Sequence, residues 1–179
     1  IARRLQDPLA ELIKIDPKSI GVGQYQHDVA QKQLTEELDF VVNTTVNRVG
    51  VDVNTASVSL LQHVSGLTAT TAKNLISLRD ELGRFEDRRQ IKDVKRLGPK
   101  TYEQAIGFLR IVGGKNPLDQ TGIHPESYAV ARMILDRAGL ALDAIGSDHA
   151  VEALGALRPA QLAQELEVGQ ATIVDIIEG

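Results

Sequence analysis

Apolar side chains recur at helical spacing along most of this 179-residue chain, and short turns interrupt them. Over residues 33–48 the apolar positions lie three or four apart, which predicts an amphipathic helix closed by Gly50. Further helices are predicted at 69–82 and 99–111. The chain is therefore expected to be all-α, with a β content close to none.

The middle of the chain contains one pattern twice, with an offset of 30 residues. The string VSGLT occupies residues 64–68, and VKRLG occupies residues 94–98. Each string is a small or polar turn around one leucine, preceded by a short predicted helix (58–64 and 88–94) and followed by a longer one. This order resembles a tandem helix-hairpin-helix motif, whose core is glycine–hydrophobic–glycine. The first copy has lost its second glycine to Thr68, and the second copy has lost its first to Arg96.

A glycine-bearing turn that enters a helix presents free backbone N–H groups at the positive end of the helix dipole, and such a place binds phosphate oxygens. In the second copy Gly98 is expected to adopt a positive φ, and Pro99 to begin the helix without wasting an N–H group. The candidate nucleic-acid-binding residues are the two turns and the nearby cations: Gly66, Leu67, Thr68, Lys95, Arg96, Leu97, Gly98, Lys100, Arg79, Arg84, Arg88 and Arg89. The alternative for each copy is a helical hairpin that only packs.

The charge is uneven along the chain. The formal net charge is −4. Residues 60–112 carry ten basic and six acidic side chains, a balance of +4, whereas residues 113–179 carry four basic and ten acidic ones. A local basic patch governs phosphate attraction, so the positive segment supports binding at the hairpin pair.

Several kinds of chemistry find no support in the sequence. There is no cysteine, which excludes disulfides and thiolate metal sites and fits a reducing, cytoplasmic compartment. No apolar run is long enough to cross a membrane. The four histidines lie far apart, no HExxH or GxSxG motif occurs, and the two glycines near residue 22 are not followed by the Gly-Lys-Ser/Thr of a nucleotide-binding loop. The chain is predicted to be a non-enzymatic monomer without a cofactor or a metal ion.

After the boundary at residues 113–117 the chain is predicted to form a small acidic bundle of short helices. They are expected at 125–138, 140–145, 148–157 and 159–166, with a last one from residue 169 or 170 onward. The predicted architecture is a tandem helix-hairpin-helix module followed by this bundle.

Four strings of this chain are similar to sequences of the bacterial Tex family of transcription accessory proteins. They are IDPKSIGVGQYQHD at 15–28, VGVDVNTAS at 49–57, RDELGRF at 79–85 and LGPK at 97–100. Members of that family carry an RNase H-like (YqgF-type) domain, tandem helix-hairpin-helix motifs, a helical segment and a C-terminal OB-fold that binds RNA. A related eukaryotic elongation factor travels with RNA polymerase.

The resemblance implies a central fragment of such a protein. Residues 1–32 would be the exit from the RNase H-like domain and a linker, residues 33–112 the tandem helix-hairpin-helix domain, and residues 113–179 an acidic helical connector. It also implies a role in transcription.

The implied partners are RNA or DNA, bound through the phosphate backbone without sequence specificity, and RNA polymerase or other transcription proteins. The alternative is a helical scaffold that positions flanking domains and docks a protein, with RNA bound by an OB-fold outside this chain.

Overall fold

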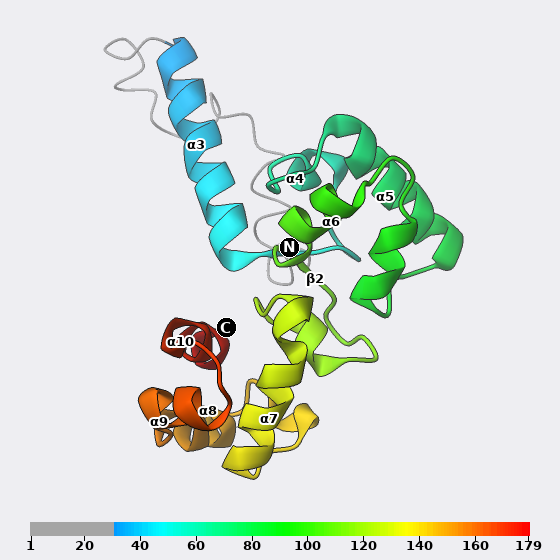
Figure 1. The fold of residues 1–179 in the computed structure, drawn as a ribbon. Helices are drawn as coiled ribbons and strands as arrows, with labels where there is room; N and C mark the ends of the chain where they lie inside the picture. The colour runs from blue at the N-terminus through cyan, green and yellow to red at the C-terminus, as the bar shows by residue number, and fades with distance from the viewer. Residues whose placement is uncertain (1–30) are drawn as a thin grey trace. The chain divides into compact units, whose positions relative to one another are not determined.

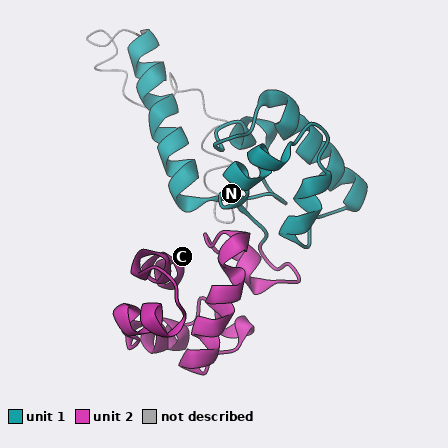
Figure 2. Cartoon of the chain, in the orientation of Figure 1, with its two compact units in different colours: residues 1–111 teal, residues 112–179 magenta. Residues whose placement is uncertain are grey.

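The computed structural model describes residues 31–179. The predictions for residues 1–30, including most of the expected exit from an RNase H-like domain, lie outside the described residues. The chain divides between Ile111 and Val112 into two units (Figure 2).

The first unit contains five helical segments and two very short strands in its described part (Figure 1). In chain order they are α3 (Gln31–Val49), β1 (Val51–Asp52), α4 (Val58–Leu61), α5 (Ala69–Leu82), the 3-10 helix η2 (Arg88–Asp93), α6 (Pro99–Ile106) and β2 (Leu109–Arg110). The strands pair in parallel, with Val51 opposite Leu109. This pair is the one sheet in the described residues, so the prediction of an all-α fold is confirmed.

The 30-residue offset of the sequence repeat persists in the core of the first unit. Val64 and Val94 are both buried. Leu61 in α4 and Ile91 in η2, three residues before each valine, are buried as well. The same offset relates the caps of α4 and η2, which are Ser57 and Asp87. Each half of the repeat therefore contributes equivalent side chains to one shared hydrophobic core.

Helix α3 joins this core only near its C-terminal end, where Val46 is fully buried and Val42 packs against the cluster. Phe40 and Val41 remain exposed. Gly50 ends the helix with a φ of 81°, and its N–H donates to the carbonyl of Val46. This end is where the sequence pattern predicted it, because glycine adopts a positive φ without steric strain.

One local prediction in the first unit is wrong. The helix expected at 99–111 ends at Ile106, because the chain then turns and extends as β2 to pair with β1. Helix α4 is capped by Ser57. The side chain of Asn54 accepts from the Phe85 N–H at 2.7 Å and donates to the Phe85 carbonyl at 3.0 Å, so it ties the chain after β1 to the chain after α5.

The second unit is a bundle of short helices. Its elements are the 3-10 helices η3 (Pro117–Gln120), η4 (Pro125–Ser127) and η5 (Leu142–Ala144), and the α-helices α7 (Tyr128–Ala138), α8 (Asp148–Gly155), α9 (Pro159–Glu165) and α10 (Gln170–Glu178). Its core is aliphatic and includes Leu118, Ile134, Leu162 and Ile173. None of the helices within residues 31–179 is long and apolar enough to span a membrane.

Candidate nucleic-acid interface

The two hairpins of the first unit have the same backbone conformation. Gly66 has a φ of 90°, and the residue 30 positions later, Arg96, has a φ of 65°. In each hairpin the next N–H closes the turn: Leu67 donates to the Val64 carbonyl at 3.1 Å, and Leu97 donates to that of Val94 at 3.2 Å.

The residue after each leucine is an extended N-cap. Thr68 begins α5, and Gly98, with a φ of −73°, begins α6. The expectation that Gly98 has a positive φ is therefore wrong, because the left-handed position of the turn lies two residues earlier, at Arg96.

Thr68 replaces the second glycine of the ideal motif with a better cap. Its hydroxyl accepts from the N–H of Thr71, and the Thr71 hydroxyl accepts from the N–H of Thr68. Such a reciprocal pair satisfies two backbone donors at the start of a helix. Gly98 has no side chain to do the same, so the N-terminus of α6 has no cap from a side chain.

The first hairpin is occupied by side chains of the protein itself. The Ser65 N–H donates to Oδ1 of Asn47 at 2.9 Å, and Nδ2 of Asn47 donates to the carbonyl of His63 at 3.2 Å. Nε2 of Gln104 donates to the Ser65 hydroxyl at 3.0 Å, and the Gln104 side chain lies 3.3 Å from where a Cβ of Gly66 would be. A phosphate oxygen would have to displace these contacts, so the first hairpin is closed.

The second hairpin is open. Lys95, Arg96 and Gly98 are exposed, and their N–H groups have no acceptor within residues 31–179. The hairpin is nonetheless anchored, since Nδ2 of Asn74 on α5 donates to the carbonyl of Lys95 at 2.8 Å. Free N–H groups on a fixed turn before a helix are the arrangement that binds phosphate oxygens.

Three cations surround the open hairpin and form what is called here the hairpin-2 cluster: Lys95, Arg96 and Lys100. All three are exposed, and none makes an ion pair with any residue that the structure describes. Lys92, which the sequence reasoning did not select, lies on the preceding helix with its ammonium 5.2 Å from the centre of the Tyr102 ring. Three exposed cations therefore lie at the hairpin whose backbone donors have no acceptor among the described residues.

The other predicted cations have different positions. Arg88 is buried, with 1% of its surface exposed, and its Nε donates to the Leu109 carbonyl at 2.8 Å. Arg79 donates to the carbonyls of Val53 and Ala56 and so fastens α5 to the chain before α4. The guanidinium groups of both arginines bind backbone oxygens inside the unit, which is a structural role, and their contact with phosphate stays a prediction.

Arg84 and Arg89 stay at the surface. Arg89 is 84% exposed, but it forms an ion pair of 2.7 Å with Asp87, the residue that caps η2. Arg84 is exposed on the turn after α5 and also takes part in a polar contact. For both, a contact with phosphate stays a prediction.

Arg110 is a further cation that sequence reasoning missed. Its Nε is buried and has no hydrogen-bond partner among residues 31–179, and its side chain lies against Gly50, where a Cβ would come within 2.4 Å of that nitrogen. Burial lowers the pKa of Arg110, and the nearby Arg88 guanidinium lowers it further. Arg110 supports the junction of α3 and β1 rather than the open hairpin.

Two turns of the second unit also place a positive φ two residues before an extended residue, but their closing hydrogen bonds differ: Leu140 donates to the Leu135 carbonyl and Val168 to that of Ala163, five residues earlier rather than three. Gly139 (φ 69°) precedes Leu140 and the extended Ala141, and Glu167 (φ 54°) precedes Val168 and the extended Gly169 that begins α10. The turn between α9 and α10 thus has glutamate where the second hairpin of the first unit has arginine. Its charge opposes phosphate binding. Sequence reasoning treated this region only as an acidic connector, although the Gly139-Leu140 pair was a readable signal.

No cluster of three or more histidine, cysteine or acidic side chains suited to a metal ion occurs within residues 31–179.

Comparisons with known proteins agree with this geometry. Residues 46–110 match the family model described as a helix-hairpin-helix motif, and residues 116–179 match one described as an HHH domain. The second match covers the unit that the sequence had suggested only as a helical connector.

The chain is also similar to longer curated proteins. The transcriptional accessory protein Tex of Neisseria gonorrhoeae is 54% identical over 178 residues, which are 99% of this chain and 23% of that protein. Protein YhgF of Escherichia coli is 55% identical over 179 residues, again 99% of this chain and 23% of the relative. The human S1 RNA-binding domain-containing protein 1 is 38% identical over 231 residues, covering the whole chain and 23% of that protein.

The chain spans about a quarter of the length of the curated relatives that it matches. Over that span it has two units, each matching a helix-hairpin-helix family model, and more than half of its residues are identical to those of the bacterial relatives. The chain therefore belongs, over the segment that it shares with these relatives, to the Tex family.

Proposed function

We propose that this chain is a non-catalytic nucleic-acid-binding module whose second hairpin holds the phosphate backbone. The observation that carries the proposal is a coincidence at residues 95–100: backbone N–H groups without an acceptor lie beside the hairpin-2 cluster, whose cations form no ion pair with any described residue. Either feature alone occurs on many helical surfaces. Together they offer both the directed donors and the counter-charge that a phosphate needs.

The two hairpins have different roles in this proposal. The first hairpin is structural, because Asn47 and Gln104 occupy its polar groups and link it to α3 and α6. The second hairpin makes the contact. Binding is therefore expected through one turn on the first unit rather than symmetrically through two.

Binding of this kind does not read sequence. Phosphate contacts set the position and orientation of a protein on nucleic acid, whereas base contacts specify sequence, and the exposed groups at residues 95–100 are backbone donors and cations. Aromatic residues make up only 3% of the chain, so base stacking adds little. The affinity should consequently fall steeply with salt, because each neutralised phosphate releases counterions.

The names of the relatives suggest where the module works. One is called a transcriptional accessory protein and another an S1 RNA-binding domain-containing protein. We place the present chain in the same context, contacting RNA or DNA during transcription beside other nucleic-acid-binding domains. A direct contact with RNA polymerase remains a prediction.

The test is fluorescence anisotropy of the chain with labelled duplex DNA, single-stranded DNA and RNA at several salt concentrations. The variant Arg96→Glu/Lys100→Glu should lose affinity for all three, and its logarithmic salt slope should fall by about two. The matched control is Arg132→Glu/Arg158→Glu, which makes the same charge change at exposed positions of the second unit. Equal losses in the two variants would show that net charge, and not the hairpin, governs binding.

The non-catalytic part of the proposal has its own test. The chain is incubated with labelled DNA and RNA in the presence of Mg²⁺ or Mn²⁺, and the substrates are expected to remain intact. Cleavage that co-purifies with the folded chain and disappears with EDTA would overturn it.

A further inference from the structure

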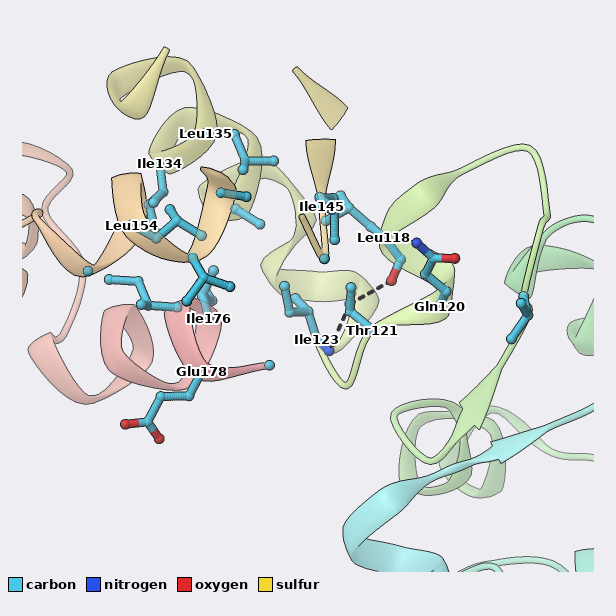
Figure 3. A pocket seen from close by; sticks show the side chains of 18 residues that line it. Leu118, Gln120, Thr121, Ile123, Ile134, Leu135, Ile145, Leu154, Ile176 and Glu178 are labelled. Atoms are coloured by element: carbon cyan, nitrogen blue, oxygen red, sulfur yellow. Dashed lines mark hydrogen bonds between the residues drawn. The ribbon is translucent and has the colours of Figure 1, made fainter. Parts of the chain in front are cut away.

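The second unit contains an apolar pocket of about 630 Å³ (Figure 3). Leu118 of η3, Ile134 of α7, Leu154 of α8 and Ile176 of α10 line it, so four separate elements contribute to its wall. Val151 on α8 also lines the pocket and is 68% exposed. The pocket is therefore accessible from solvent along α8.

The hydroxyl of Thr121, which lines the pocket, already has its hydrogen bonds within the protein. It donates to the Leu118 carbonyl at 2.7 Å and accepts from the Ile123 N–H at 3.2 Å, as the dashed lines in Figure 3 show. The carboxylate of Glu178 points away from the labelled apolar side chains. Besides Thr121 the polar side chains in the lining are those of Gln120 and Glu178, so an occupant would meet a mainly apolar surface.

The three α-helices that line the pocket are net acidic, although α7 carries Arg132 and Arg137 beside Asp136. Helices α8 and α10 carry Asp148, Glu152, Asp175 and Glu178 and have no lysine or arginine. The turn before α10 adds Glu167. This charge repels nucleic acid and attracts cationic side chains at the edge of an otherwise apolar contact.

We propose that this pocket docks an amphipathic helix of a partner protein, with apolar anchors in the pocket and lysine or arginine on the flanks. Helices bind apolar grooves through anchors at positions i, i+3, i+4 and i+7, and a pocket of this volume accommodates two or three such side chains. The acidic rim selects a basic partner. The surface lies wholly in the second unit, so the inference goes beyond the nucleic-acid contact and stands independently of it.

A second copy of this chain is a poorer occupant. Apart from the pocket itself, the large exposed apolar side chains of the described helices include Phe40 and Val41 of α3. That helix carries Glu36, Glu37 and Asp39 around them. Its acidic surface would be repelled by the acidic rim, whereas a basic helix would be attracted.

The probe is a fluorescently labelled helical peptide with leucines at i, i+3, i+4 and i+7 and lysines elsewhere. Two control peptides have the same leucines with glutamates in place of the lysines, or the same composition in a scrambled order that destroys the apolar face. The proposal expects measurable binding of the first peptide only. Equal binding of the glutamate or scrambled peptide would overturn it.

Two matched variants locate the contact. Val151→Lys places a like charge at the exposed edge of the pocket and should weaken binding about tenfold. Met133→Lys makes the same charge change at an exposed position of α7 that does not line the pocket, and it should have little effect. Circular dichroism checks that both variants fold.

Two outcomes contradict the proposal. Equal weakening by both variants would mean that the peptide responds to net charge alone. Concentration-dependent dimerisation in sedimentation experiments that Val151→Lys abolishes would assign the pocket to a second copy of the chain. Binding of nucleic acid should be unchanged in Val151→Lys. A failure of the docking proposal can therefore be told apart from a failure of the proposal for the hairpin-2 cluster.

Discussion

Gly66 and Arg96 occupy the same position in the two hairpins of the first unit, 30 residues apart, and both have a positive φ, 90° and 65° respectively. An L-residue in the left-handed region is strained by contact between its Cβ and the backbone, and glycine is not. The second hairpin therefore keeps a cation at a position where glycine would be more stable. The expected reason for such a residue is function, since strained positions cluster at binding sites.

The substitution Arg96→Gly should separate stability from binding. Removing the strain should raise the free energy of unfolding by about 0.5–1 kcal/mol, after the greater freedom of glycine in the unfolded chain is taken into account. Removing the cation should weaken binding to all nucleic acids and lower the salt slope by about one. Thermal denaturation and anisotropy measure the two effects on one sample. A lower free energy of unfolding would contradict the inference that the backbone at Arg96 is strained. Unchanged binding would contradict the inference that Arg96 contacts phosphate.

Asn47 should matter for stability and not for nucleic-acid contact. Asn47→Ala removes the acceptor of the Ser65 N–H and the donor to the His63 carbonyl, both partly buried. Leaving such groups unpaired should reduce the free energy of unfolding by about 1–3 kcal/mol. Gln33→Ala, on the exposed surface of the same helix, is the control and should change it little.

Affinity of the folded Asn47→Ala variant for nucleic acid should be that of the unmodified chain. A clear gain in affinity would mean that the first hairpin, once opened, also binds phosphate. A clear loss would mean that the first hairpin already contributes.

Much of the helical organisation is predictable because its signals are local. The helix expected at 69–82 has those bounds in α5, since Thr68 caps its start and Gly83 follows its end. The helix expected at 99–111 is too long, because the pairing of β2 with β1 depends on residues almost 60 positions away. Periodicity within a short window does not contain that information.

The candidate site was predictable in position but not in detail. Lys95, Arg96, Gly98 and Lys100 are exposed as expected, whereas aligning Gly98 with the ideal motif placed the positive φ at the wrong residue. The internal repeat would have predicted the positive φ at Arg96, because it aligns Arg96 with Gly66.

The same alignment also indicates that Arg88 is buried. Residue 88 corresponds to Val58, a partly buried apolar position packed on the core. The closure of the first hairpin by Asn47 was not predictable, because it depends on how α3 packs.

Arg88 and Arg89 are adjacent in sequence but should respond very differently to substitution by methionine. Arg88→Met removes a buried charged donor from the Leu109 carbonyl and should reduce the free energy of unfolding by about 2–4 kcal/mol, although it also relieves the repulsion of Arg110. Arg89→Met removes an exposed ion pair and should change the free energy of unfolding by less than about 1 kcal/mol. Chemical denaturation of both variants provides the comparison. Equal effects would contradict the structural assignment of Arg88.

The turn between α9 and α10 allows the sufficiency of the hairpin-2 cluster to be tested. It shares with the second hairpin a positive φ, at Glu167, and an extended residue that begins the helix, at Gly169, so Glu167 and Ala171 correspond in position to Arg96 and Lys100. Placing Glu167→Arg/Ala171→Lys in a chain whose own hairpin carries Arg96→Glu/Lys100→Glu should restore salt-dependent binding in part, with a salt slope larger by about one to two. Partial recovery is expected because the acidic side chains of α10 remain nearby.

The matched control for this transplant is Glu152→Arg/Gln164→Lys, which makes the same charge change at exposed helix positions without a hairpin turn. Recovery with the transplant and not with the control would show that the turn conformation and two cations together are enough to hold a phosphate. Recovery of binding with both variants would mean that the added positive charge alone, without the turn, restores binding. No recovery in a folded transplant would mean that the second hairpin depends on further groups of the first unit, and Lys95 and Lys92 would be the next residues to substitute.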